Sequence, residues 1–241
     1  MSEKCKRLHE TLERLPIIKY PFDLKCLPES GIYFFYEKGE MWGHGGNKPR
    51  IVRIGTHKKN NFKSRMADHY LIDRKIVYDV NKPKPSDRSI FRKNLGRAIL
   101  NKNNDSYLQI WNVDFTLKEN RNNMKNERDL QKEKEIENQI SCLLEYNFFF
   151  RFIIFDNEEK RIGTDSLEKR LIGTVANCTE CQPSNYWLGK YSSIEKIRRS
   201  GLWIVQYLQS ESIDEKDMLL IEDLISKTLQ WIENNNERCK S

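Results

Sequence analysis

The sequence contains no long hydrophobic run and no apolar segment behind a basic N-terminus. Nothing in its 241 residues approaches the roughly 20 consecutive apolar residues that a membrane-spanning helix needs. We therefore expect neither a membrane anchor nor a signal peptide, and a cytoplasmic location. The longest apolar cluster, residues 148–155, is interrupted by Arg151 and predicts a buried strand.

The cysteines are too scattered for a disulfide framework. They are Cys5, Cys26, Cys142, Cys178, Cys181 and Cys239, and reduced thiols are the simplest interpretation. Cys178 and Cys181 form half of a zinc-ribbon pattern, but no second Cys-x-x-Cys or histidine pair accompanies them. We therefore favour two unpaired cysteines after a helix over a metal site.

Acidic residues are outnumbered, which gives a net charge of +7 and a pI near 9.0. Such a balance favours partners that carry phosphate, above all nucleic acid, although it can also serve only solubility. Hydrophobic residues make up 38% and charged residues 32% of the chain, so much of it must be solvated surface. The length allows one domain with a proper core and some additions.

The predicted elements alternate between helix and strand without an internal repeat. Residues 1–29 predict a helical lead-in, and residues 30–36 and 50–55 predict two strands joined by a glycine-rich loop. Two helices are predicted at 62–71 and 89–101, followed by a strand at 107–115. Residues 117–135 predict a charged, exposed helix or arm, and its continuation is expected to dock on the core. A strand at 148–155, a helix at 166–177 and a final amphipathic helix complete the prediction.

Two short motifs lie on the first two predicted strands, Gly-Ile-Tyr at 31–33 and Arg-Ile-Gly at 53–55. Strand side chains alternate faces, so Tyr33 and Arg53 would project from one side of the sheet, with Val52 and Ile54 on the other. A guanidinium beside a phenol favours the phenolate. The alternative is a structural tyrosine beside a solvated arginine.

Arg65 and His69 follow on the next predicted helix, four residues apart and therefore on one face. An arginine can hold a scissile phosphate, and a histidine can move a proton near neutral pH. Exposed arginine and histidine are common, so the pair gains meaning only from the motifs before it.

Together these residues resemble the opening of the GIY-YIG nuclease family, with Arg53 where the family name has its second tyrosine. Some members carry a basic residue there. The resemblance implies an α/β (α+β) fold, a small antiparallel sheet flanked by helices, that cuts DNA phosphodiesters with a metal ion. The nuclease core would span residues 30–189 with an insertion at 102–147, followed by a C-terminal addition at 190–241.

The resemblance also implies a metal-binding glutamate on the helix after the third core strand. Glu168 is the match, with Mg²⁺ (or Mn²⁺) as its ion, and it outranks Glu137, Glu145 and Glu158 by position. Ser166 predicts the N-cap of that helix. Asn185 matches a family asparagine, within a segment that resembles a bacterial branch with few characterised members.

The roles implied for the other site residues follow the same resemblance. Tyr33 would be the general base, His69 would relay its proton, and Arg65 would neutralise charge on the phosphate. Arg53 would tune Tyr33 or grip phosphate.

Four basic residues of the second predicted helix and the loop at 39–49 would contact the DNA backbone; the four are Arg88, Arg92, Lys93 and Arg97. The resemblance is compatible with a homodimer and with a role in restriction or defence.

Two alternatives belong to other classes. One is a nucleic-acid-binding module of the same fold without catalysis, motivated by Arg53. The other is a globular interaction protein with a coincidental Gly-Ile-Tyr, in which the site residues would not converge.

Overall fold

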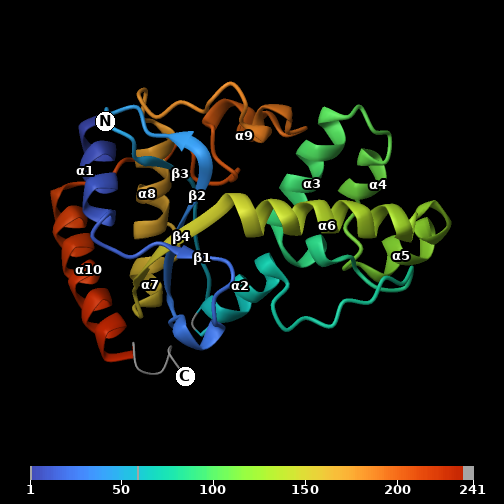
Figure 1. The fold of residues 1–241 in the computed structure, drawn as a ribbon, viewed down its shortest axis with the longest axis horizontal. Helices are drawn as coiled ribbons and strands as arrows, with labels where there is room; N and C mark the ends of the chain where they lie inside the picture. Colours follow the sequence, from blue (N-terminus) through green and yellow to red (C-terminus); the bar gives the residue numbers. More distant parts are fainter. Residues whose placement is uncertain (1, 59, 236–241) are drawn as a thin grey trace.

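A four-stranded antiparallel sheet lies between two layers of helices in the computed structural model, which describes residues 2–58 and 60–235 (Figure 1). The strands are β1 (Ile18–Lys19), β2 (Gly31–Met41), β3 (Pro49–Thr56) and β4 (Phe148–Ile154), in the order β1-β4-β2-β3. Each neighbouring pair is antiparallel. The predicted α+β class, a small antiparallel sheet flanked by helices, is confirmed.

The α-helices that surround the sheet are α1 (Ser2–Leu12), α2 (Phe62–Tyr70), α3 (Ile90–Lys102), α4 (Leu108–Asn112), α5 (Lys118–Met124), α6 (Leu130–Asn147), α7 (Glu158–Arg161), α8 (Leu167–Ala176), α9 (Glu195–Ser200) and α10 (Glu215–Asn235). Short 3₁₀ turns connect them at η1 (Leu24–Cys26), η2 (Pro85–Arg88), η3 (Lys125–Glu127) and η4 (Leu188–Tyr191). None of the described helices combines the length and apolar character that a membrane span requires.

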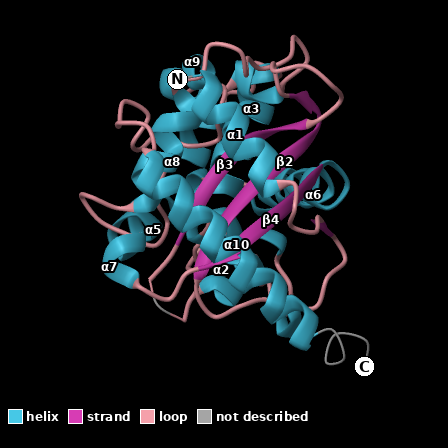
Figure 2. Cartoon of the chain, turned by 90° about the vertical axis from the view of Figure 1, so that its left-hand side faces the viewer, coloured by secondary structure: helices cyan, strands magenta, loops and turns pink. Residues whose placement is uncertain are grey.

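The alternating side chains of β2 divide the core into two clusters. Ile32 and Phe34 pack with α1, α8 and α10, which Figure 2 shows in front of the sheet. Tyr33 and Phe35 point the other way and pack with α2, α3 and α6. The middle of the sheet is therefore apolar on both faces, and Arg53, which projects from it, is buried.

A β-bulge changes the predicted facing of β3. Phe35 pairs with Arg53, but Tyr36 pairs with Ile51, so Val52 is the extra residue. Val52 packs in the Tyr33 cluster, and the prediction that it shares a side with Ile54 is wrong. Arg53 still projects from the same face of the sheet as Tyr33, as predicted, because the bulge begins only at the preceding residue, Val52.

Within residues 107–115, where the sequence predicted a strand, Leu108–Asn112 form helix α4. Trp111 is fully buried, and its indole Nε1 donates a hydrogen bond of 3.1 Å to the carbonyl oxygen of Lys93. Its ring lies on Gly96, where an added Cβ would lie 2.6 Å from Nε1. Packing on α3 therefore overrides the weak alternation that favoured a strand.

The charged stretch 117–135 is divided between two environments. Helix α5 has no buried residue, whereas α6 docks through Ile136, Ile140 and Leu144, as predicted for its later part. Helix α6 also buries Glu133 and Glu137, whose carboxylates pair with arginines at 2.6 and 2.7 Å. Part of the charged stretch therefore lies in the protein interior and not on the surface.

Two further local predictions are confirmed. Ser166 caps α8, since its hydroxyl accepts a hydrogen bond from the backbone N–H of Lys169. Helix α10 buries Ile221, Leu224 and Ile225 on one face.

The expectation of reduced thiols does not hold throughout, because Cys26 is disulfide-bonded.

Candidate active site

Four of the predicted catalytic residues line one hollow of about 310 Å³. Tyr33 comes from β2, Arg53 from β3, Arg65 from α2 and Glu168 from the first turn of α8. Thr56 and His57, which directly follow the Arg-Ile-Gly motif, line the same hollow. Segments more than a hundred residues apart in the sequence thus meet here.

Tyr33 is placed by the glycine of the second motif. Tyr33 and Gly55 are directly opposite across the β2–β3 pair, and a Cβ on Gly55 would lie 2.6 Å from Cζ of the phenol ring. Only glycine lets the ring lie flat over the neighbouring strand. Rings of Phe35 and Phe62 meet the Tyr33 ring edge-on at 5.5 and 5.9 Å and hold it in place.

Arg53 lies diagonally beside Tyr33 and is held by other groups. Its guanidinium carbon lies 4.9 Å from the ring centre of Phe91, and its Nη1 donates to the carbonyl oxygen of Trp203. The indole Nε1 of Trp203 in turn donates to a carboxylate oxygen of Glu37 at 3.0 Å. The Nε of Arg53 is buried and has no hydrogen-bond partner among the described residues.

Arg65 reaches the hollow from α2. Its Nη1 donates to the carbonyl oxygen of Arg88 at 3.0 Å, and the Asp68 carboxylate lies 3.9 Å away. The side chain is largely covered, at 17% exposure, and it lines the hollow.

His69 lies behind Tyr33 and outside the lining of the hollow. It is fully buried, its ring meets that of Tyr33 edge-on at 5.9 Å, and Nδ1 lies 2.7 Å from Oγ of Ser89. Burial lowers the pKa of His69 well below its ordinary value, and the charges of Arg65 and Arg53 lower it further. His69 is therefore a neutral imidazole near pH 7.

Glu168 is the one carboxylate among the described residues that line the hollow. One of its oxygens accepts a 3.1 Å hydrogen bond from the backbone N–H of Thr56. Burial raises the pKa of Glu168 to about 7, although the Thr56 N–H and the charges of Arg53 and Arg161 oppose this rise.

A hard divalent ion fits this setting. Mg²⁺ needs only one or two protein carboxylates because it keeps several waters, and the hollow gives such waters room. The rival Glu137 is fully buried and bound to Arg92, so it offers no comparable site.

Asn185 lies apart from these residues. It is exposed on a loop, and its Oδ1 accepts a hydrogen bond from Nζ of Lys190 at 2.9 Å. Asn94 of α3, which sequence reasoning missed, lines the hollow instead, buried to 1% exposure. The available signal was its position four residues after Ile90, which also lines the hollow and shares its helix face.

The basic residues predicted to contact DNA differ in exposure. Arg92 is fully buried and pairs with Glu137, and Lys93 is almost as buried and pairs with Asp87 at 3.0 Å. Neither side chain reaches the surface. Arg97 is half-buried, and only Arg88 is exposed. The reason is that α3 packs against α6 and η2, where Arg92 and Lys93 find acidic partners.

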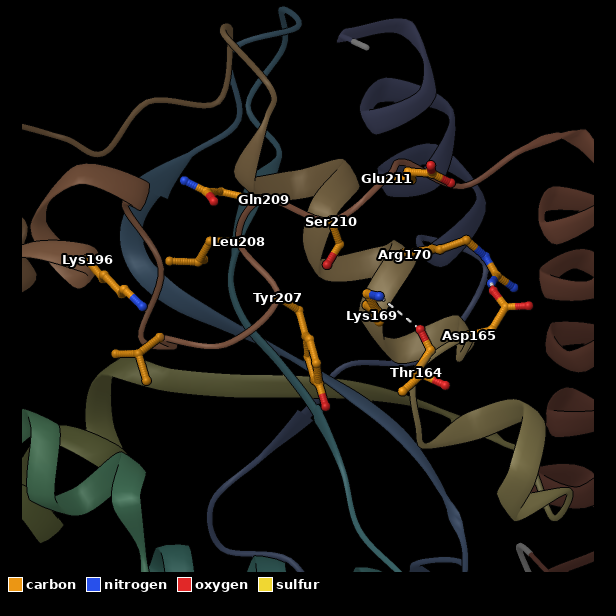
Figure 3. Close-up of a pocket in the computed structure, with 11 residues that line it drawn as sticks. Thr164, Asp165, Lys169, Arg170, Lys196, Tyr207, Leu208, Gln209, Ser210 and Glu211 are labelled. Carbon is orange, nitrogen blue, oxygen red and sulfur yellow. Dashed lines mark hydrogen bonds and ion pairs between the residues drawn. The ribbon is translucent and has the colours of Figure 1, made fainter.

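A second hollow of about 560 Å³ adjoins the first and shares Val205 with it. Figure 3 shows Lys196 on one side of it and Lys169 and Arg170 on the other. Arg170 pairs with Asp217 at 2.7 Å, but Lys196 is exposed. Lys169 directly follows Glu168, so basic groups border the first hollow here.

Comparison with known proteins identifies the family of the chain. The sequence model of a family described as GIY-YIG domain matches residues 5–231, from the first turn of α1 nearly to the end of α10. No curated protein and no solved structure matches the chain. Since the match covers most of the sequence, the chain belongs to the GIY-YIG domain family, a family of nucleases.

Proposed function

We propose that this protein is a metal-dependent endonuclease that hydrolyses DNA phosphodiester bonds in the hollow between β2, β3, α2 and α8. The convergence of Tyr33, Arg53, Arg65 and Glu168 on one 310 Å³ space carries the proposal. It speaks against a coincidental motif, for which these residues would lie apart.

Glu168 would hold the divalent ion through its carboxylate, with Thr56 N–H fixing one oxygen. When bound, the ion supplies positive charge that stabilises the leaving oxygen. A nearby cation also offsets the burial that favours the protonated carboxyl, so binding keeps Glu168 ionised.

Arg65 and Arg53 would bind the scissile phosphate. Arg65 presents its partly exposed guanidinium to the hollow, where it neutralises the charge that builds on the phosphate oxygens. Arg53 is fixed by Phe91 and Trp203 and keeps Nε without a partner among the described residues. This arrangement favours a grip on phosphate over a direct hydrogen bond to Tyr33.

Tyr33, as the phenolate, would accept a proton from the attacking water and become the neutral phenol, and so act as the general base. His69 contacts the ring of Tyr33 from behind and is neutral, so it can hold a proton only transiently. We therefore give His69 the task of positioning Tyr33, with proton relay as its second task. Asn94 takes the place in the hollow that was expected of Asn185.

DNA would approach across the second hollow. Lys196 and Lys169 lie beside the catalytic space and can pair with backbone phosphates, together with exposed Arg88. In this proposal they take the DNA-contacting role predicted for Arg92 and Lys93, which instead form ion pairs inside the protein.

The test is a nicking assay on supercoiled plasmid with Mg²⁺, with Mn²⁺ and with EDTA, beside a gel-shift assay on the same DNA. We expect nicking with either ion and none with EDTA, with restoration by added Mg²⁺. DNA binding without nicking under every condition would replace the nuclease with the binding module. Nicking that persists in EDTA would contradict the metal requirement.

A further inference from the structure

A second group of side chains gathers at the other end of α8. Its members are Cys5 of α1, His44 of the loop between β2 and β3, and Cys178 and Cys181 after α8. The ligand atoms of all four lie within 4.8 Å of one another. The sequence analysis favoured two unpaired cysteines here, because the other two members, Cys5 and His44, lie far from Cys178 and Cys181 in the chain.

The distances within this group suit a tetrahedral metal. Sγ of Cys5 and Sγ of Cys181 are 3.9 Å apart, and Sγ of Cys178 is 3.4 Å from Nε2 of His44. Sulfur atoms bound to one Zn²⁺ at about 2.3 Å in tetrahedral geometry are separated by about 3.8 Å. Three thiols and an imidazole form a soft donor set, which Zn²⁺ takes in closed structural sites.

The loop that carries His44 is shaped to reach the cysteines. A Cβ on Gly43 would overlap the backbone of Glu180, which lies between Cys178 and Cys181, so only glycine permits this approach. His9 lies nearby but is not a free ligand. Its Nδ1 lies 2.9 Å from the carbonyl oxygen of Cys5, and its Nε2 accepts from the N–H of Ile51 at 3.1 Å.

We propose that Cys5, His44, Cys178 and Cys181 bind one structural Zn²⁺ that joins α1, the β2–β3 loop and the end of α8. Four protein ligands leave no open position for substrate, which marks the site as structural. The ten residues of α8 separate it from Glu168 by about 15 Å along the helix. The site is therefore distinct from the oxygen-ligated metal site of the proposed nuclease.

Elemental analysis of the purified full-length protein tests this directly. We expect about one zinc per chain, and loss of that zinc in the double variant Cys178→Ser, Cys181→Ser. Cys142→Ser is the matched control, because Cys142 is an exposed free thiol on α6. Zinc retained by the double variant, or iron in place of zinc, would overturn the proposal.

Cobalt spectroscopy keeps the proposal testable even if the double variant does not fold. Wild-type protein, stripped of metal under reducing conditions and given Co²⁺, should develop the intense visible bands of a tetrahedral thiolate complex. The variant His44→Cys should keep the bands and shift them as a fourth thiolate replaces imidazole. Octahedral spectra, or a wild-type chain that takes up neither Co²⁺ nor Zn²⁺, would contradict the site. Glu168→Ala should leave these readouts unchanged, so failure of the nuclease proposal would be separately visible.

Discussion

The two ends of α8 present opposite kinds of metal chemistry. The first turn offers one carboxylate, Glu168, in a hollow lined by arginines and a phenol. The segment after the last turn offers Cys178 and Cys181, which meet a third thiol and an imidazole in a tight group. An open oxygen site can admit substrate, whereas a closed sulfur and nitrogen site can only hold the fold together.

This difference predicts that the two sites fail independently and in different ways. Loss of the oxygen site should stop chemistry and spare the fold. Loss of the sulfur site should weaken the fold and spare chemistry wherever the protein stays folded. The following experiments are arranged from the largest expected effect to the smallest.

Removal of the carboxylate should have the largest effect. Glu168→Ala should reduce the rate of plasmid nicking by about 10³-fold or more, because the charge that stabilises the leaving oxygen is lost. DNA binding by gel shift and zinc content should stay at the wild-type level. Nicking at the wild-type rate would remove Glu168 from the catalytic site.

Removal of the other catalytic groups should cost less. Tyr33→Phe keeps the ring that covers Gly55 but loses the base, and Arg65→Ala loses charge on the phosphate. Each should lower the single-turnover nicking rate by about 10²-fold, with the melting temperature nearly unchanged. Asn185→Ala is a suitable control, since Asn185 lies outside the hollow and should nick normally.

Removal of the sulfur site should lower stability. The double variant Cys178→Ser, Cys181→Ser should lose its zinc and melt about 10 °C lower, measured by scanning calorimetry. At a temperature well below melting, its nicking rate should stay within about threefold of wild type. A folded, zinc-free variant that cannot nick would show that the two sites are coupled through α8.

The smallest effect concerns pH. Burial raises the folded pKa of Glu168 to about 7, above its unfolded value of about 4.5. The folded protein then binds the proton more tightly, so wild type loses stability as pH rises from about 4.5 to about 7.

In Mg²⁺-free buffer, Glu168→Gln should therefore nearly match wild type at about pH 4.5 and exceed it by roughly 3 kcal/mol at pH 8. Urea unfolding at several pH values measures this difference. A constant gap across the range would mean that Glu168 titrates normally.

The catalytic hollow was largely predictable, because its parts lie in local patterns. Alternation along a strand places Tyr33, and the Ser166 cap fixes where α8 begins. The helical step of four from Arg65 to His69 placed Arg65 correctly but not His69, which is buried behind Tyr33. Local patterns do not show how deeply a side chain is buried. Nothing in the sequence near Arg92 shows that it is buried against Glu137, 45 residues later.

The sulfur site was missed for the same reason. Cys5 and His44 reach Cys178 only through the packing of α1 and the β2–β3 loop, so no spacing rule connects them. The bulge at Val52 and the helical form of residues 107–115 likewise depend on neighbouring elements, since Trp111 needs Gly96 beneath it.

Zinc content and nicking rate, measured on the same preparations of wild type, Glu168→Ala and the double cysteine variant, test the central claim most directly. The two-site account predicts zinc without nicking for Glu168→Ala, and nicking without zinc for the double cysteine variant at low temperature. Nicking that disappears with the zinc, or zinc that disappears with Glu168, would contradict the separation of a catalytic oxygen site from a structural sulfur site.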